Sequence, residues 1–308
     1  MHATFRPITG PDELPLFLQL TYDLDDEVAD DLERGNRRPE WIWIAEHDGT
    51  VVARAAWWSR PGASEPYLMD FFDFADGHAE TAETLVRTAM EKVVPHGSVP
   101  PEYLRFIPPD WQRDPAAVQQ RMAVLERLGA RLLVERLRLE WRPGTPVAPD
   151  DGRLRFRGFT GAEEALELMT RTVEGTLDAH NRADLTRMSP RAVAEEHFHG
   201  ELERWPSPQE WWRVGTRPDG EPVGFVFPAR NDYGPIIAYI GVLPGHRGHG
   251  YIDAILAEGT RVLAAHDIPR IRANTDVGNV PMARAFARHG YVNYQNQIDM
   301  TWAPSVAG

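Results

Sequence analysis

The chain has 308 residues, of which 42% are hydrophobic and 26% charged, which is typical of a globular protein long enough for two domains. It contains no cysteine, which excludes disulfide bonds, thiolate zinc sites and a cysteine nucleophile. The formal net charge of −13 argues against nucleic-acid binding, because neutralising phosphates requires a basic surface.

The first half of the chain predicts a regular series of elements. A short N-terminal strand precedes a helix over Asp12–Tyr22. Asp48-Gly49 lies between two apolar runs and is a strong signal for a two-residue hairpin turn. A glycine-terminated helix and a final strand over Leu137–Trp141 close this half.

The second half repeats this plan after a linker. Residues 142–152 are rich in proline, glycine and aspartate, which favours a domain boundary. Residues 155–161 resemble residues 4–10, and a helix over Ala162–Gly175 follows. A hairpin comes next, and this half also closes on a glycine-terminated helix and a strand, Ile298–Trp302. We therefore expect two domains of similar architecture.

A glycine-rich loop is the most informative segment of the second half. The apolar run 236–240 predicts a buried strand, and apolar residues from Ile252 onward have helical spacing. The loop between them, Val242–Tyr251, contains three glycines and an arginine. The free N–H groups at the start of a helix favour phosphate, and glycines let a ligand approach the backbone. The segment therefore predicts a phosphate-binding loop.

This loop resembles the pyrophosphate loop of the GNAT superfamily of acyl-CoA-dependent N-acetyltransferases. The family pattern R/Q-x-x-G-x-G/A is matched from Arg247 to Ile252, and Ile252 departs from the usual glycine or alanine. Residues 279–291 resemble the second family motif, a helix that begins after an asparagine and ends at a glycine. The resemblance implies an α/β (α+β) chain of two tandem GNAT-like domains, each a mixed, mostly antiparallel sheet flanked by helices. It is similar in architecture to the mycothiol synthases, whose first domain is degenerate.

The resemblance also implies the residues that bind acetyl-CoA, the expected acyl donor. The pyrophosphate would be held by Arg247, Gly248, His249, Gly250, Tyr251 and Ile252. The pantetheine and thioester would pair with Val242 and Leu243, near which a backbone N–H would bind the oxyanion. Asn279 and Met282 would border the pantetheine, and Phe286 would pack near the sulfur.

The first half has no such loop. At the matching place stands the segment 71–78, in which Asp73 and Asp76 replace arginine and would repel a pyrophosphate. We therefore expect a degenerate domain over residues 1–145, without the loop, and an acetyltransferase domain over residues 153–308.

Proton transfer is harder to assign. Many family members carry a glutamate on the fourth strand, where this chain offers Tyr239, our candidate catalytic residue. The usual tyrosine acid is replaced by Phe286. Candidate contacts to the amine acceptor are Glu174, Asp178 and His180. We expect direct transfer in a ternary complex to a small-molecule or peptide amine, because no cysteine can hold an acyl intermediate.

Other functions were weighed against this one. Residues 195–199 have a metal-binding composition, but His-x-His places the two rings on different helix faces, so we expect no metal. The missing tyrosine and glutamate favour a non-catalytic CoA-binding or regulatory protein as the alternative. An aminoacyl-tRNA-dependent transferase would need a basic face, which the net charge opposes.

The sequence also predicts a location. The N-terminus has no apolar signal segment, and no apolar run reaches membrane-spanning length. We expect a cytoplasmic protein that binds neither nucleic acid nor membranes. The acceptor and the oligomeric state stay open.

Overall fold

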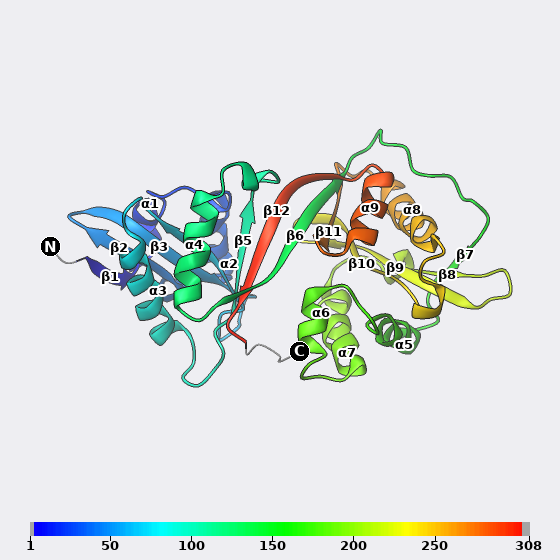
Figure 1. Cartoon of the computed structure of the whole chain (residues 1–308), viewed down its shortest axis with the longest axis horizontal. Coiled ribbons are helices and arrows are strands. Elements are labelled where there is room, and N and C mark those ends of the chain that lie inside the picture. Colours follow the sequence, from blue (N-terminus) through cyan, green and yellow to red (C-terminus); the bar gives the residue numbers. More distant parts are fainter. Residues whose placement is uncertain (1–2, 304–308) are drawn as a thin grey trace. The chain divides into compact units, whose positions relative to one another are not determined.

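The computed structural model describes residues 3–303, which form two compact units (Figure 1). Unit 1 holds residues 3–135 and 297–303, and unit 2 holds residues 136–296. Residues 1–2 and 304–308, which the sequence assigns to the outer ends of the two domains, lie outside the described part. In that part, no helix has the length and apolar character needed to cross a membrane.

Each half of the chain contributes six strands. In the first half these are β1 (Thr4–Pro7), β2 (Ile42–His47), β3 (Thr50–Trp58), β4 (Leu68–Phe74), β5 (Glu102–Ile107) and β6 (Arg131–Trp141). In the second half they are β7 (Arg155–Arg157), β8 (Arg213–Thr216), β9 (Pro222–Asn231), β10 (Gly234–Val242), β11 (Ile271–Asp276) and β12 (Val292–Thr301). The helices are α1 (Leu14–Phe17), α2 (Val28–Arg34), α3 (Ala79–Val93), α4 (Ala116–Arg127), α5 (Ala162–Thr172), α6 (Ala179–Asp184), α7 (Pro190–Gly200), α8 (Tyr251–Ala264) and α9 (Val280–Arg288).

The sheet of unit 1 has the strand order β1-β2-β3-β4-β5-β12, with a parallel pairing between β4 and β5. Helices α3 and α4 pack on one face of this sheet, and α1 and α2 pack on the other. Alternating side chains of β2 supply both cores, since Trp43 packs with α3 and Ile44 packs with α1.

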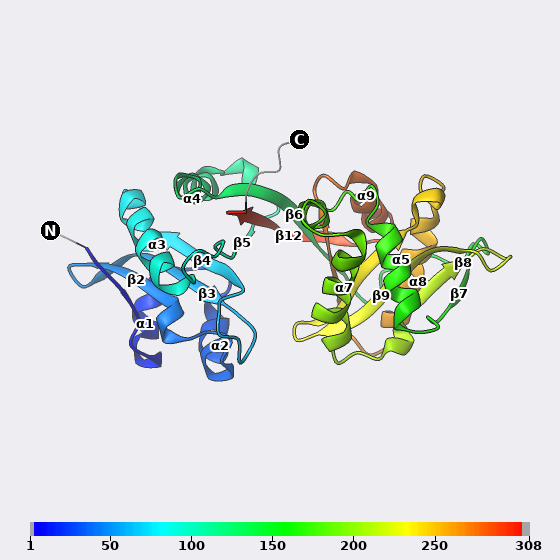
Figure 2. The same ribbon diagram turned by 90° about the horizontal axis from the view of Figure 1, so that it is seen from below.

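The sheet of unit 2 has the strand order β6-β11-β10-β9-β8-β7, and β10 and β11 are its parallel pair. Helices α5 and α7 cover one face, and α8 and α9 cover the other. In Figure 2, α5 and α7 lie in front of β9, and α8 lies behind it. Both units therefore have the expected mixed, mostly antiparallel sheet between helices.

The two units exchange their last strands, which differs from the contiguous division into 1–145 and 153–308. Residues 136–141 of β6 pair with β11 in unit 2. The end of β12 instead belongs to unit 1, where Ile298 and Met300 are buried in the core with α3. Both strands follow a glycine-closed helix and have a similar apolar pattern, so the local sequence does not determine which sheet each one joins.

Local signals predict the turns well and one helix poorly. Asp48 and Gly49 have φ of +50° and +77°, as a two-residue hairpin turn requires, and they join β2 to β3. The helix expected over Asp12–Tyr22 is only the short α1 after a 3₁₀ turn. Pro15 explains its late start, because proline is tolerated only in the first turn of a helix.

Candidate functional site

A bulge in β10 sets the direction of Tyr239. The register between β9 and β10 shifts between Ile237 and Tyr239. Ile237 packs on the α8–α9 face, whereas Tyr239 packs on the α5–α7 face. Without the extra residue, alternation would place both side chains on one face. The bulge therefore turns the Tyr239 ring toward α5 and α7.

The same strand presents backbone groups on the side away from β9. The Leu243 N–H donates to Val223 O at 2.9 Å, so Leu243 is engaged with β9. Because hydrogen-bonded positions alternate in an antiparallel ladder, the N–H and C=O of Val242 point away from β9. On that side the register with β11 contains one pair, Ile236 with Arg272. Of the two residues expected near the oxyanion, Val242 thus has the suitable backbone orientation, and Leu243 does not.

The predicted phosphate loop leads directly into α8. Gly248 and Gly250 have φ of +81° and +75°, a left-handed conformation that favours glycine. Gly250 is the N-cap of α8, and no side chain caps the helix. The side chain of Ile252 packs against the core between α8 and the sheet, so its branched carbons turn away from the loop. The first turn of α8 thus fits a phosphate group.

Arg247 has a different role from the one that the motif implies. Its guanidinium donates to four backbone carbonyls: Val242 at 3.0 Å, Thr172 at 2.7 Å, Glu174 at 2.7 Å and Gly175 at 3.2 Å. Desolvation lowers the pKa of Arg247, although it is still charged at neutral pH. The side chain therefore ties the end of α5 to the end of β10 and is occupied by these bonds.

A second arginine lies on the loop. Arg153 Nη2 donates to His249 O at 2.6 Å, and its guanidinium carbon lies 4.6 Å from the centre of the Tyr251 ring. Its Nη1 lies 3.7 Å from the position of a Cβ on Gly250. The side chain is 44% exposed. Sequence analysis missed Arg153 because it lies 96 residues before His249, in the segment that follows the linker.

The second motif builds the start of α9. Asn279 Oδ1 accepts a hydrogen bond from Met282 N at 3.3 Å and caps this helix. Met282 is half-buried, so part of its side chain stays accessible. Phe286 is only 1% exposed and packs edge-on against Tyr291 in the core. Its ring therefore has almost no surface to offer a thioester.

Tyr239 lies in a line of polar side chains from three elements. Asn181 of α6 is buried, and its Nδ2 lies 3.5 Å from Tyr239 Oη. Asn181 Oδ1 lies 2.9 Å from His197 Nε2 of α7. Burial, followed by the charge of Asp178, raises the pKa of Tyr239 to about 12. At neutral pH its phenol therefore carries a proton.

Asp276 anchors the start of α6. Its Oδ2 accepts the Ala179 N–H at 2.7 Å, and Arg136 Nε lies 3.1 Å from its Oδ1. Burial and the charge of Asp178 raise the pKa of Asp276. Asp178 itself caps α6 by accepting from Asn181 N at 2.8 Å.

The three predicted acceptor contacts differ in position. Asp178 and His180 lie at the start of α6, near the Tyr239 line, and the charge of His180 acts on Asp276. Glu174 is exposed after α5, and it is its backbone carbonyl that binds Arg247. Asn181 and His197 complete the site, and sequence analysis did not assign either of them to it. Their spacing of 16 residues matches no motif that could have revealed them.

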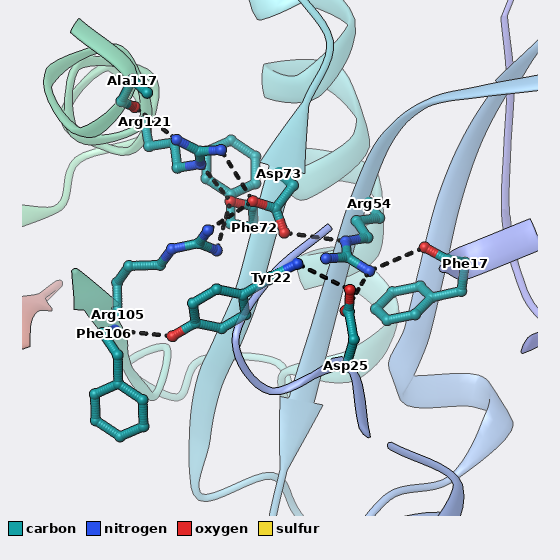
Figure 3. Close-up of polar contacts among 10 residues, drawn as sticks. All are labelled: Phe17, Tyr22, Asp25, Arg54, Phe72, Asp73, Arg105, Phe106, Ala117 and Arg121. Atoms are coloured by element: carbon teal, nitrogen blue, oxygen red, sulfur yellow. Dashed lines mark hydrogen bonds and ion pairs between the residues drawn. The ribbon is translucent and has the colours of Figure 1, made fainter. Parts of the chain in front are cut away.

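Unit 1 has an ion cluster at the matching place. Asp73, near the end of β4, binds Arg54 at 3.0 Å, Arg105 at 2.9 Å and Arg121 at 3.0 Å (Figure 3). Burial would raise the pKa of Asp73, but the charges of these three arginines outweigh it and lower the pKa. Asp73 thus lies buried in the unit and is neutralised, whereas the sequence interpretation placed it where it would repel a pyrophosphate. Asp76 is exposed.

Comparison with known proteins decides the family. Residues 179–291, all within unit 2, match the sequence model of the acetyltransferase (GNAT) family. Unit 2 is a GNAT acetyltransferase domain. No curated protein matches the chain.

Solved structures extend the likeness to the whole chain. A GCN5-related N-acetyltransferase from Sphaerobacter thermophilus is 15% identical with a TM-score of 0.62, and the match covers 99% of this chain and 98% of that one. A tandem GNAT protein from the clavulanic acid biosynthesis pathway is 15% identical with a TM-score of 0.51, covering 99% and 100%. A GCN5-related N-acetyltransferase from Kribbella flavida is 14% identical with a TM-score of 0.52, covering 91% and 95%. The chain has the tandem GNAT architecture and is an N-acetyltransferase of this type.

No metal-binding group emerges from the described residues. Among residues 3–303, no three histidine, aspartate or glutamate side chains are arranged to hold a metal ion.

Proposed function

We propose that unit 2 binds acetyl-CoA and transfers its acetyl group directly to the amine of a small molecule or peptide. The observation that carries this proposal is the combination of an uncapped, glycine-started α8 with the neighbouring end of β10, inside the segment that matches the family. In this proposal the first turn of α8 binds the pyrophosphate, and Val242 pairs with the pantetheine or the thioester oxygen. Gly248, His249 and Tyr251 line the loop, while Arg247 holds it in place.

Direct transfer follows from the side chains available. The chain has no cysteine to carry an acetyl group, so the amine attacks the thioester carbonyl itself. Tyr239 is the proposed acid for the leaving sulfur, since its phenol is protonated at neutral pH. Asp178 and His180 are the proposed contacts to the acceptor. Unit 1 is the proposed degenerate domain, which does not bind CoA through the segment 71–78.

Calorimetric titration with acetyl-CoA tests the proposal. The parent protein is expected to bind with a micromolar dissociation constant. In Gly250→Glu, a carboxylate and a strained backbone replace the N-cap glycine, and we expect the affinity to fall more than tenfold, a change of about 1.4 kcal/mol or more. Gly62→Glu is the matched control, because Gly62 also has a left-handed φ of +81° but lies in unit 1.

The possible results separate cleanly. If the parent protein does not bind acetyl-CoA, the proposed function is wrong. If Gly250→Glu binds as tightly as Gly62→Glu, the donor lies elsewhere than at α8.

A further inference from the structure

We propose that His197 is the catalytic base that takes the proton of the acceptor amine, with Asn181 holding its ring in the tautomer that leaves Nδ1 unprotonated. This inference rests on the proposed function and adds a residue to the same site. It also gives a role to the segment 195–199, whose composition had suggested a metal site.

The tautomer follows from the hydrogen-bond order around Asn181. Its Nδ2 donates toward Tyr239 Oη at 3.5 Å, so its Oδ1 is the atom that faces His197 at 2.9 Å. A carbonyl oxygen accepts only, and therefore Nε2 of His197 carries the hydrogen. The remaining nitrogen, Nδ1, then has a lone pair, as a general base requires.

The position of Nδ1 supports this role. Among the described residues, Nδ1 of His197 makes no hydrogen bond and is not one of the buried polar atoms without a partner, so it reaches solvent. The ring centre lies 6.0 Å from that of Tyr239, on the α5–α7 face. An asparagine that fixes the tautomer of a histidine base also occurs in unrelated acyl-transfer sites.

Tyr239 and His197 divide the proton transfers. The amine lone pair forms a bond to the thioester carbonyl carbon while an N–H proton moves to Nδ1 of His197. The C–S bond breaks, and the sulfur takes the Tyr239 hydroxyl proton, which is available because Tyr239 Oη accepts from Asn181. Solvent then removes the proton from His197 and returns one to Tyr239.

Other charges near this line are few or paired. Asp178 and Arg247 act on Tyr239. Helix α5 packs against α7 and carries the ion pairs Glu163–Arg191, Glu164–Arg157 and Glu167–Arg171.

The kinetic experiment compares two neighbouring histidines in the full chain. His197→Gln keeps an amide donor for Asn181 but has no basic nitrogen. His199→Gln is the matched control, because His199 is exposed and bonded to Glu203 at 2.9 Å. The probe is release of CoA thiol from acetyl-CoA with spermidine, glucosamine, tyramine and glycylglycine as acceptors.

We expect His197→Gln to lower kcat/KM by about 10²- to 10³-fold and to remove the acidic limb of the pH profile. The affinity for acetyl-CoA should stay unchanged, and His199→Gln should match the parent. An unaltered rate and pH profile in His197→Gln would overturn the assignment.

A second measurement needs no acceptor. Nitrogen-15 NMR of histidine-labelled protein, with His197→Gln used to assign the signal, reports which ring nitrogen carries hydrogen. Hydrogen on Nε2 supports the proposal, and hydrogen on Nδ1 contradicts it even if every amine fails to react. Failure of acetyl-CoA to bind would instead refute the proposed function, which separates the two conclusions.

Discussion

The two units build the same central strands and finish them differently. In unit 1, β4 and β5 pair in parallel only at Leu68 and Met69, and Phe72 O then accepts from Arg121 at 3.1 Å. In unit 2, β10 and β11 share one pair, and β10 then leads through the glycine loop into α8. One fold thus carries either a buried ion cluster or an exposed loop at the end of the same strand.

The difference shows how a unit without the loop is stabilised. Asp73 draws three arginines into the interior of unit 1, and two of them also bond to Phe72 O. Arg247 of unit 2 also binds backbone carbonyls, but it leaves the start of α8 uncapped. The position of the arginines, more than their number, distinguishes the two units.

The largest effect is expected where the cluster of unit 1 is broken. Asp73→Asn would leave buried guanidinium groups without their shared carboxylate, at a cost of about 3–5 kcal/mol. Hydrogen exchange measured by mass spectrometry should rise across β4 and β5, while exposed Asp76→Asn serves as the control. Unchanged exchange would mean that the cluster does not stabilise unit 1.

This contribution has a defined pH dependence. The pKa of Asp73 is below its usual value of 3.8 in the folded chain, so its stabilisation is complete at neutral pH. It is lost as pH falls below 3.8 through the folded pKa, because the carboxylate then takes up a proton. The parent and Asp73→Asn should therefore converge in stability in that acidic range.

The exchanged strands provide the second test. Met300 is fully buried in the core of unit 1, so Met300→Ala should destabilise that unit by about 2–5 kcal/mol. Leu139→Ala should destabilise unit 2, since Leu139 packs in its core. Hydrogen exchange resolved by unit measures both effects. A contiguous division of the chain predicts the opposite pattern.

A smaller effect is expected at the loop. Arg153→Ala should weaken acetyl-CoA binding about five- to tenfold, a change of about 1 kcal/mol, because it removes a cation beside the start of α8. Titration at increasing salt should show the difference shrinking, since this side chain is partly exposed. Arg155→Ala, an exposed arginine on β7, is the control. Equal affinities for the two variants would place the phosphates elsewhere.

The smallest effect contrasts Asp276 with Asp73. The pKa of Asp276 is raised in the folded chain, so its ionised form costs stability at neutral pH, and that cost disappears as pH falls through the folded pKa. Asn can still accept the Ala179 N–H, so Asp276→Asn should raise the stability of unit 2 by about 1 kcal/mol or less at pH 7. Urea unfolding from pH 7 to pH 4 measures the difference, which should shrink toward low pH. A clear loss of stability would show that the Arg136 pair dominates.

Local chemistry let the sequence predict much of the fold. The Asp48-Gly49 turn, the Gly250 start of α8 and the Asn279 cap of α9 each depend on residues within a few positions. Such signals also predicted the hairpins, the order of elements in both halves and the family of unit 2.

Only the tertiary structure decided which distant residues meet. Asn181 and Tyr239 are 58 residues apart, and their contact depends on a bulge in β10 and on the anchoring of α6 by Asp276. The exchange of β6 and β12, the carbonyl contacts of Arg247 and the burial of Asp73 arise in the same way. Local propensity is set by near neighbours, whereas these arrangements are set by which surfaces and charges are buried together.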